Sequence, residues 1–244
     1  MPDLPIKKDL LYAYRIIGYL GMDDLTYTHI TVRPENADFF YIAKFGVLFN
    51  QVTFGDLVKV SLNGEILDGE EVVYNKTAYT IHGSIYNSRS DVNAVYHLHT
   101  QASIAVSVME CGLLPLSQFA MPFFENISYY KYDSLALDKA TQGADLVNSL
   151  GSYKAMLMRS HGLLTCGSNL QEALFYTRFL EQACRTQVAI LSTKQKYILP
   201  GPDVCRKARQ DMLTFEERLG ERDWKALSKL FEKGSDPLSL CLQS

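Results

Sequence analysis

Three histidines in two short motifs have the residue type and spacing that metal chemistry requires. His97 and His99 lie two residues apart, directly after residues 91–95 (DVNAV), which are typical of a strand that enters a core. Alternate side chains of a strand share a face, so these two imidazoles would start from Cα atoms about 6.5–7 Å apart and could converge on one ion. His161 lies in residues 159–162 (RSHG), at an expected turn between two apolar runs.

Such a set of imidazoles would suit zinc or another divalent transition metal. Zn–N bonds are about 2.0–2.1 Å long, and three histidines with an open fourth position are the pattern of a catalytic rather than a structural zinc site. The alternative is that the pair is a chance feature of a strand and the third histidine an ordinary turn residue, because short motifs often match by chance. For the His97–His99 pair taken by itself, the spacing favours the chance interpretation.

Residues 79–105 (YTIHGSIYNSRSDVNAVYHLHTQASIA) resemble the core motif of the class II aldolase/adducin family, and residues 159–167 (RSHGLLTCG) resemble its second motif. The resemblance covers about residues 8–193 and is nearest to the adducin-like bacterial-type branch, in which a His-Ile-Thr run occupies the first strand. It implies an α/β fold in three layers, α/β/α, with a central mixed, largely antiparallel sheet. The zinc ligands that it implies are His97, His99 and His161.

The resemblance also implies candidate catalytic residues, with one departure from the family pattern. In the family's aldolases the metal polarises a substrate carbonyl, a glutamate acts as base and a tyrosine protonates the departing fragment. Ala78 occupies the glutamate position, four residues before His82, and alanine cannot take a proton. Tyr132 is the best match to the tyrosine, although packing is the commoner role of such a residue. Glu125 is the nearest loop carboxylate that could replace the base.

The positions that bind the substrate anion in the family's aldolases are also altered. The Gly-Asn pair of the first hairpin is matched here by Thr28 and His29, and the serine- or threonine-glycine element by Phe45 and Gly46. Lysines near these positions could bind phosphate as point charges, or could simply be solvated. His29 could equally be a strand histidine whose hydrogen bonds are satisfied. The candidate substrate-binding residues are His29, Lys44, Gly46, Lys76 and Thr77.

Two functions follow from the resemblance. The first is a zinc-dependent class II aldolase-like lyase that acts on a small hydroxylated carbonyl or sugar-phosphate compound. The second is a non-catalytic interaction or assembly domain, like the adducin head, that retains a metal site. The three histidines favour the first function and Ala78 favours the second. Family aldolases are tetramers with sites at subunit boundaries, so we expect a homo-oligomer, with a tetramer favoured.

Composition excludes several other classes of protein. The chain has 244 residues, 47% hydrophobic and 21% charged, which is typical of one soluble globular domain. A net charge of −3 gives no indication of a nucleic-acid partner or an anionic membrane surface. Neither a signal peptide nor a membrane-spanning run is recognisable, so we expect a cytoplasmic protein. Five scattered cysteines, none in a CxxC pair, argue against disulfides and a cysteine zinc site.

Hydrophobic periodicity and turn residues predict alternating helices and strands in one large domain. Residues 1–195 would form the aldolase/adducin-like domain, and residues 196–244 a C-terminal helical extension of that domain. The irregular, aromatic-rich residues 116–134 and the extension could together cover a subunit boundary. The expected helices are residues 7–20, 75–87, 100–109, 135–150 and 171–191, and the expected strands are residues 25–33, 39–42, 57–61, 91–99, 155–158 and 163–166.

Overall fold

The structure is a computed structural model that describes residues 3–67 and 73–232. At its centre lies a seven-stranded sheet with the strand order β3-β2-β1-β4-β7-β6-β5. Neighbouring strands are antiparallel except for β5 and β6, which are parallel. The predicted mixed, largely antiparallel sheet is thus confirmed. The strands are β1 (His29–Val32), β2 (Phe39–Ala43), β3 (Leu57–Ser61), β4 (Ala94–Leu98), β5 (Ser128–Tyr130), β6 (Ala155–Met158) and β7 (Gly162–Gly167).

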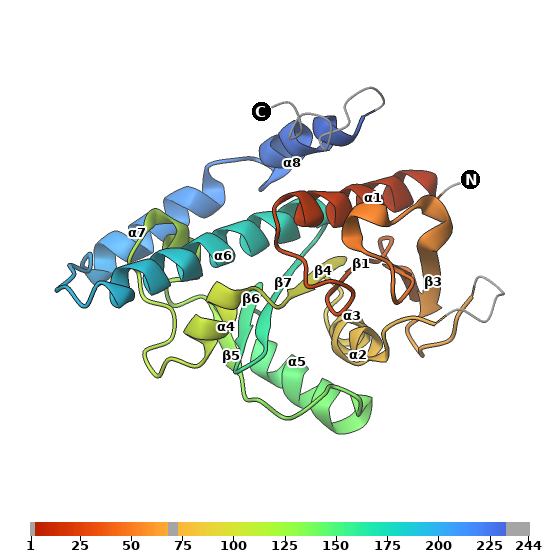
Figure 1. Cartoon of the computed structure of the whole chain (residues 1–244), viewed down its shortest axis with the longest axis horizontal. Coiled ribbons are helices and arrows are strands. Elements are labelled where there is room, and N and C mark those ends of the chain that lie inside the picture. Colours follow the sequence, from red (N-terminus) through yellow and green to blue (C-terminus); the bar gives the residue numbers. More distant parts are fainter. Residues whose placement is uncertain (1–2, 68–72, 233–244) are drawn as a thin grey trace.

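Helices cover both faces of the sheet, which makes the three layers expected (Figure 1). On one face lie α1 (Leu4–Tyr19) and the long α6 (Leu170–Ser192), and on the other lie α2 (Lys76–Ala78), α3 (Ser84–Ser88) and α5 (Ala144–Leu150). Each face has its own apolar cluster, because successive strand residues point to opposite faces. Ile30 and Tyr96 face α1 and α6, whereas Val95 and Leu164 face the other layer.

The helix predicted over residues 75–87 is not a regular α-helix. A π-helical turn, Tyr79–Gly83, separates α2 from α3, and Asn75 caps the start by accepting a hydrogen bond from the Thr77 backbone N–H. The helix predicted over residues 135–150 likewise begins with a π-helical turn, Lys139–Gly143. The two segments pack closely: a Cβ atom on Gly143 would collide with the Ser84 hydroxyl and would lie 3.3 Å from the Thr80 carbonyl oxygen. Glycine at position 143 allows this approach without displacing Ser84, which periodicity in the sequence does not reveal.

The predicted N-cap of the next helix has a different role. Thr100 precedes α4 (Gln101–Ser107), but its hydroxyl makes no capping hydrogen bond. It donates instead to the carboxylate of the buried Glu181 on α6, which also accepts a hydrogen bond from Arg185 Nε at 2.6 Å. This connection joins the end of β4 to α6 and so fixes the chain directly after His99.

The C-terminal residues that the structure describes form two polar helices, α7 (Pro202–Thr214) and α8 (Glu221–Ser228). Trp224 of α8 belongs to the same apolar cluster as α1 and α6. Arg209 of α7 donates a 2.7 Å hydrogen bond to the carbonyl of Phe124, so α7 packs on the aromatic-rich segment. Residues 233–244 of the expected extension lie outside the described residues. Among the helices described, none has the length and apolar character needed to cross a membrane.

Candidate metal centre

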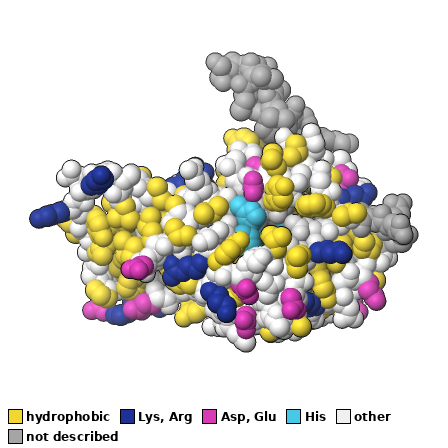
Figure 2. All heavy atoms as spheres, turned by 60° about the horizontal axis from the view of Figure 1, so that its bottom comes forward, with side chains coloured by type: hydrophobic (Ala, Val, Ile, Leu, Met, Phe, Trp, Pro, Cys, Tyr) yellow, Lys and Arg dark blue, Asp and Glu magenta, His cyan; other side chains and the backbone are white. Residues whose placement is uncertain are grey.

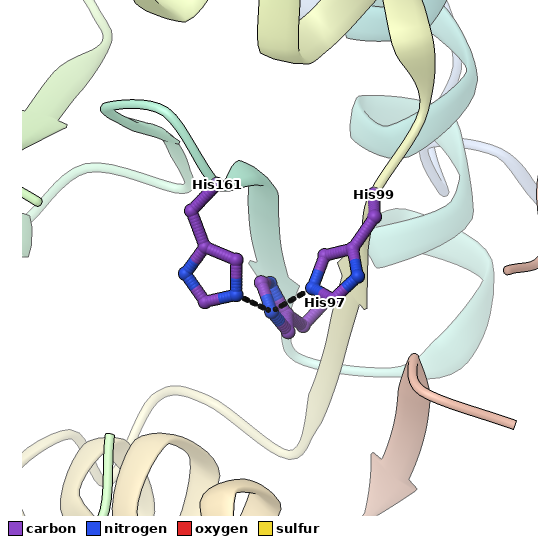
Figure 3. A group of neighbouring side chains, drawn as sticks. All are labelled: His97, His99 and His161. Carbon is purple, nitrogen blue, oxygen red and sulfur yellow. Dashed lines mark hydrogen bonds between the residues drawn. The ribbon is translucent and has the colours of Figure 1, made fainter. Parts of the chain in front are cut away.

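The structure brings together the three predicted metal ligands. His97 is on β4, His99 follows that strand, and His161 lies in the turn between β6 and β7 (Figure 3). Their Nε2 atoms converge: His97 Nε2 is 3.1 Å from His99 Nε2 and 3.2 Å from His161 Nε2. The possible ligand atoms of the three rings all lie within 4.8 Å of one another. The side chains therefore have the proximity that a shared ion requires.

The partners of two rings determine where their hydrogens lie. His97 Nδ1 is 3.0 Å from the carbonyl oxygen of Leu163, and His99 Nδ1 is 3.1 Å from the Asp24 carboxylate. Both partners can only accept, so each Nδ1 carries a hydrogen and each Nε2 of a neutral ring presents a lone pair. Two lone pairs facing each other at 3.1 Å repel unless a cation lies between them. This donor set fits a bound metal ion.

The environment also favours neutral rings, the form that binds metal. Burial lowers the pKa of His97 well below its usual value of 6.5, and the neighbouring imidazoles add to this effect. Burial lowers the pKa of His161 to about 4. At neutral pH these rings are therefore unprotonated and their Nε2 lone pairs are available.

The second motif positions the third histidine through close backbone contacts. A Cβ atom on Gly162 would lie 2.3 Å from the Leu98 carbonyl oxygen, so only glycine lets this turn approach the end of β4. Ser160 has a φ of +58°, and its N–H donates to Ser107 Oγ at 3.1 Å. Arg159 Nη1 donates to the Ser107 carbonyl at 2.7 Å. The turn is thus held on α4 as well as on the sheet.

A second histidine pair, His29 and His82, lies directly behind the candidate metal ligands. His29 on β1 is the cross-strand partner of His97 on β4, with ring centroids 5.1 Å apart. His29 Nδ1 is 3.0 Å from His82 Nε2, and His82 Nδ1 is 2.7 Å from Thr31 Oγ1. All four side chains are buried. The sequence motifs did not predict His82 or Thr31 as part of the site. Thr31 could have been found from its spacing, because residues 29 and 31 share one face of the strand.

The predicted substrate-binding residues separate into two groups. His29 and Thr77 meet beside the metal ligands, with Thr77 Oγ1 3.5 Å from His29 Nε2, and Lys76 is exposed next to them. Lys44 and Gly46 lie in the turn after β2, where Gly46 has a φ of +90°. In the described part of the chain no hydrogen bond joins either of these two residues to the histidines.

The predicted catalytic residues are also differently placed. Tyr132 is exposed and lines, with Arg159 and His161, a pocket that adjoins the metal ligands. Glu125 faces α7, where its carboxylate accepts hydrogen bonds of 2.7 and 3.0 Å from Arg206. Within this chain the carboxylate is therefore engaged away from the three histidines.

Ala78 contributes no polar group to the site. It is fully buried and belongs to the apolar cluster that includes Phe40, Ile42 and Ile81. A carboxylate introduced there would enter an apolar environment, where an unpaired charge is costly.

Histidine side chains reach the molecular surface near the middle of the face shown in Figure 2. Two hollows are lined by candidate metal ligands. One is the pocket next to Tyr132 and His161. The other is lined by His99, Asp23 and Arg185, between the end of β4 and α6. A small polar molecule could therefore approach the candidate metal centre from solvent.

A mixed sheet covered on both faces, with histidines from the end of β4 and from the β6–β7 turn converging at one edge, defines an α/β domain with a candidate metal centre. The chain belongs to the Class II Aldolase and Adducin N-terminal domain family, whose model matches residues 8–188. The fold and the family that the sequence motifs predicted are thereby confirmed.

Relatives on both branches of this family are similar to the chain. A Pseudomonas aeruginosa protein provisionally named as an aldolase class 2 protein is 37% identical over 233 residues, covering 93% of this chain and 89% of that protein. Rat alpha-adducin is 36% identical over 191 residues, covering 77% of this chain but only 26% of adducin. Among solved structures, L-fuculose 1-phosphate aldolase from Glaciozyma antarctica has a TM-score of 0.81 and 25% identity, covering 93% of this chain and 88% of that chain.

Proposed function

We propose that this protein is a metal-dependent carbon–carbon lyase of the class II aldolase type, with zinc or another divalent transition metal held by His97, His99 and His161. Its substrate would be a small hydroxylated carbonyl or sugar-phosphate compound. The observation that carries the proposal is the convergence of three Nε2 atoms, two of which have lone pairs fixed by acceptor-only partners. The similarity to the structure named L-fuculose 1-phosphate aldolase supports it.

Each group would have a distinct task in such a reaction. The bound metal would supply Lewis-acid polarisation of the substrate carbonyl. His29 and Thr77 would bind substrate oxygens beside it, and the more distant Lys44, Gly46 and exposed Lys76 would contact an anionic group. Tyr132, at the mouth of the pocket, would donate a proton to the departing fragment.

The residue that would act as base in this reaction is not at the usual position, which Ala78 occupies here. Ala78 is buried in an apolar cluster and cannot accept a proton. Glu125 is the candidate replacement, and in this chain its carboxylate is paired with Arg206 on α7. We therefore propose that Glu125 acts only across a subunit boundary, in a cytoplasmic homo-oligomer whose sites are shared between neighbouring chains.

A non-catalytic assembly domain that retains the metal is the alternative. Two observations favour it: the apolar environment of Ala78, and the 36% identity to rat alpha-adducin. Metal content alone does not separate the two functions, because a scaffold could also hold zinc.

The test combines metal analysis with turnover. Purified wild type should contain about one divalent metal ion per chain, and it should cleave at least one member of a panel of ketose phosphates and hydroxylated carbonyl compounds. The double variant His97→Ala/His99→Ala should lose both properties. Tyr132→Phe is the matched control, because it should keep the metal and lose turnover. Unchanged metal in the double variant would contradict the ligand assignment, and full metal occupancy with no turnover on the panel would favour the assembly function.

A further inference from the structure

A continuous chain of polar contacts runs from the protein core to the candidate metal centre. Tyr86 OH is 2.7 Å from Thr31 Oγ1, which is 2.7 Å from His82 Nδ1. His82 Nε2 is 3.0 Å from His29 Nδ1, and His29 Nε2 is 3.5 Å from Thr77 Oγ1. Only Thr77 is not fully buried. In such a chain each hydrogen can be placed from its neighbours.

At the inner end of this chain of contacts, Tyr86 determines the direction in which the hydrogen bonds are donated. Among the described residues, the buried Tyr86 hydroxyl has Thr31 as its single hydrogen-bond partner, so it must donate there to avoid an unmade bond. Burial raises the pKa of Tyr86, which keeps that hydrogen on the phenol. Thr31 then donates its own hydrogen to His82 Nδ1. Neutral His82 carries its hydrogen on Nε2 and donates to His29 Nδ1, which leaves the hydrogen of His29 on Nε2.

The outer end agrees with this direction through a longer and weaker contact, 3.5 Å between His29 Nε2 and Thr77 Oγ1. The Thr77 hydroxyl donates to Asn75 Oδ1 at 2.7 Å, and that oxygen also accepts the Thr77 backbone N–H at 3.0 Å. The amide orientation of Asn75 is fixed by its Nδ2, which donates to the Tyr27 carbonyl at 3.3 Å. With its hydrogen used, Thr77 Oγ1 can only accept from His29. The opposite polarity would leave Tyr86 without an acceptor and His29 Nε2 without a donor.

We propose that the buried Tyr86–Thr31–His82 chain fixes His29 as the Nε2–H tautomer, so that His29 presents a neutral hydrogen-bond donor to an oxyanion of the substrate beside the metal. The oxyanion is a phosphate or a carboxylate oxygen. The substrate half of this statement rests on the function proposed above. Tyr86, Thr31 and His82 are then positioning residues, and His29 is a binding residue rather than a base.

The geometry leaves the His29 Nε2–H group available to donate to a bound ligand. At 3.5 Å the contact from His29 Nε2 to Thr77 Oγ1 is at the long limit of a hydrogen bond, so a better acceptor can replace it. The local structure also explains how the chain is assembled. His29 and Thr31 share one face of β1, and His82 and Tyr86 are four residues apart on one face of the helical segment above it.

The tautomer can be measured without any activity assay. In zinc-loaded, 15N-labelled protein, correlation spectra of the ring nitrogens should show His29 with a hydrogen on Nε2 and a bare Nδ1, with signals assigned by His29→Gln and His82→Gln. Tyr86→Phe should produce a mixture of both His29 tautomers. Tyr96→Phe is the matched control, because its hydroxyl donates to the Leu170 carbonyl on the opposite face of the sheet. A hydrogen on His29 Nδ1 in wild type would overturn the proposal.

The ligand is tested with inorganic phosphate and acetate as separate probes. One of them should shift the His29 Nε2–H signal on titration, and the probe that does so identifies the class of oxyanion. If Tyr86→Phe makes the two tautomers equal, only half of the molecules present the donor, and affinity should fall about twofold. His29→Gln, whose amide can donate from the same place, should bind more tightly than His29→Leu.

Failure of the two proposals can be told apart. If neither anion shifts the signal, the donor role of His29 is wrong even where the tautomer is as proposed. If no substrate in the panel is turned over, the lyase function is wrong while the tautomer measurement keeps its meaning.

Discussion

At the scale of single residues, the orientation of the candidate metal ligands depends on the hydrogen-bond partners behind them. His97 donates through Nδ1 to a backbone carbonyl, which a side-chain substitution cannot remove. His99 donates through Nδ1 to the Asp24 carboxylate, which is a side chain and can be changed. Such partners orient the imidazole and raise its basicity as a ligand. The sequence did not assign Asp24 to the site, because nothing in its spacing relates it to His99, 75 positions later in the chain.

We therefore predict that Asp24→Ala weakens zinc binding by about tenfold or more, the usual effect of removing such a partner. Competition with a chelator of known affinity would measure the change. Asp23→Ala is the matched control, since it removes the same charge from the neighbouring position and has no hydrogen bond to His99 among the described contacts. Equal effects of the two substitutions would show that general charge, and not the hydrogen bond, supports the ligand.

At the scale of elements, sequence patterns predicted the sheet better than the layer of α2, α3 and α5 that covers one face of it. Strands β6 and β7 follow from two apolar runs, and the shared face of His97 and His99 follows from alternation; both are local properties of the sequence. The two π-helical turns are not visible in such local patterns, and they lie where Gly143 approaches Ser84 from a distant part of the chain. The proximity of His97, His99 and His161 was predictable because their two motifs are specific in combination. The hydrogen-bond chain through His82 was not, since it needs the tertiary contact between β1 and a helix.

The buried histidines of these elements give a prediction about acid stability of the metal-free protein. Burial lowers the pKa of His29, His82 and His97 well below 6.5, the value expected in the unfolded chain. As pH falls through 6.5, the unfolded chain therefore takes up protons that the folded chain does not, and the free energy of unfolding decreases. Above pH 6.5 these histidines are neutral in both the folded and the unfolded chain, and they do not reduce the free energy of unfolding. Each such group contributes about 1.4 kcal/mol per pH unit while only the unfolded form is protonated.

Urea unfolding of chelator-treated protein between about pH 7.5 and 5 measures this slope. His82→Gln should reduce the slope by about 1.4 kcal/mol per pH unit, because one of the titrating groups is gone. An unfolding free energy that stays constant between neutral pH and pH 5 would mean that the buried rings take up protons in the folded state over the same pH range as in the unfolded chain.

At the scale of the whole molecule, one end of the surface is unusually apolar. Figure 2 shows hydrophobic side chains gathered over the end of the molecule that holds α7 in Figure 1. In the segment between α6 and α7, Ile198 is 93% exposed, and Tyr197 and Leu199 are also exposed. Contiguous exposed apolar side chains of this kind mark interaction surfaces. The same end carries Glu125 and its partner Arg206, which links the surface to the question of a shared active site.

We predict that the protein is a homotetramer whose subunit contacts include this apolar end. Light scattering at micromolar concentration should give the mass of four chains, each of 27.6 kDa. Ile198→Asp should yield smaller species, because a charge would have to be desolvated in the contact. Leu4→Asp is the matched control: it adds the same charge at an exposed position of α1, at the opposite end of the molecule in Figure 1, and should leave the mass unchanged. A stable wild-type monomer would contradict the prediction and would remove the only route by which Glu125 could act as a base.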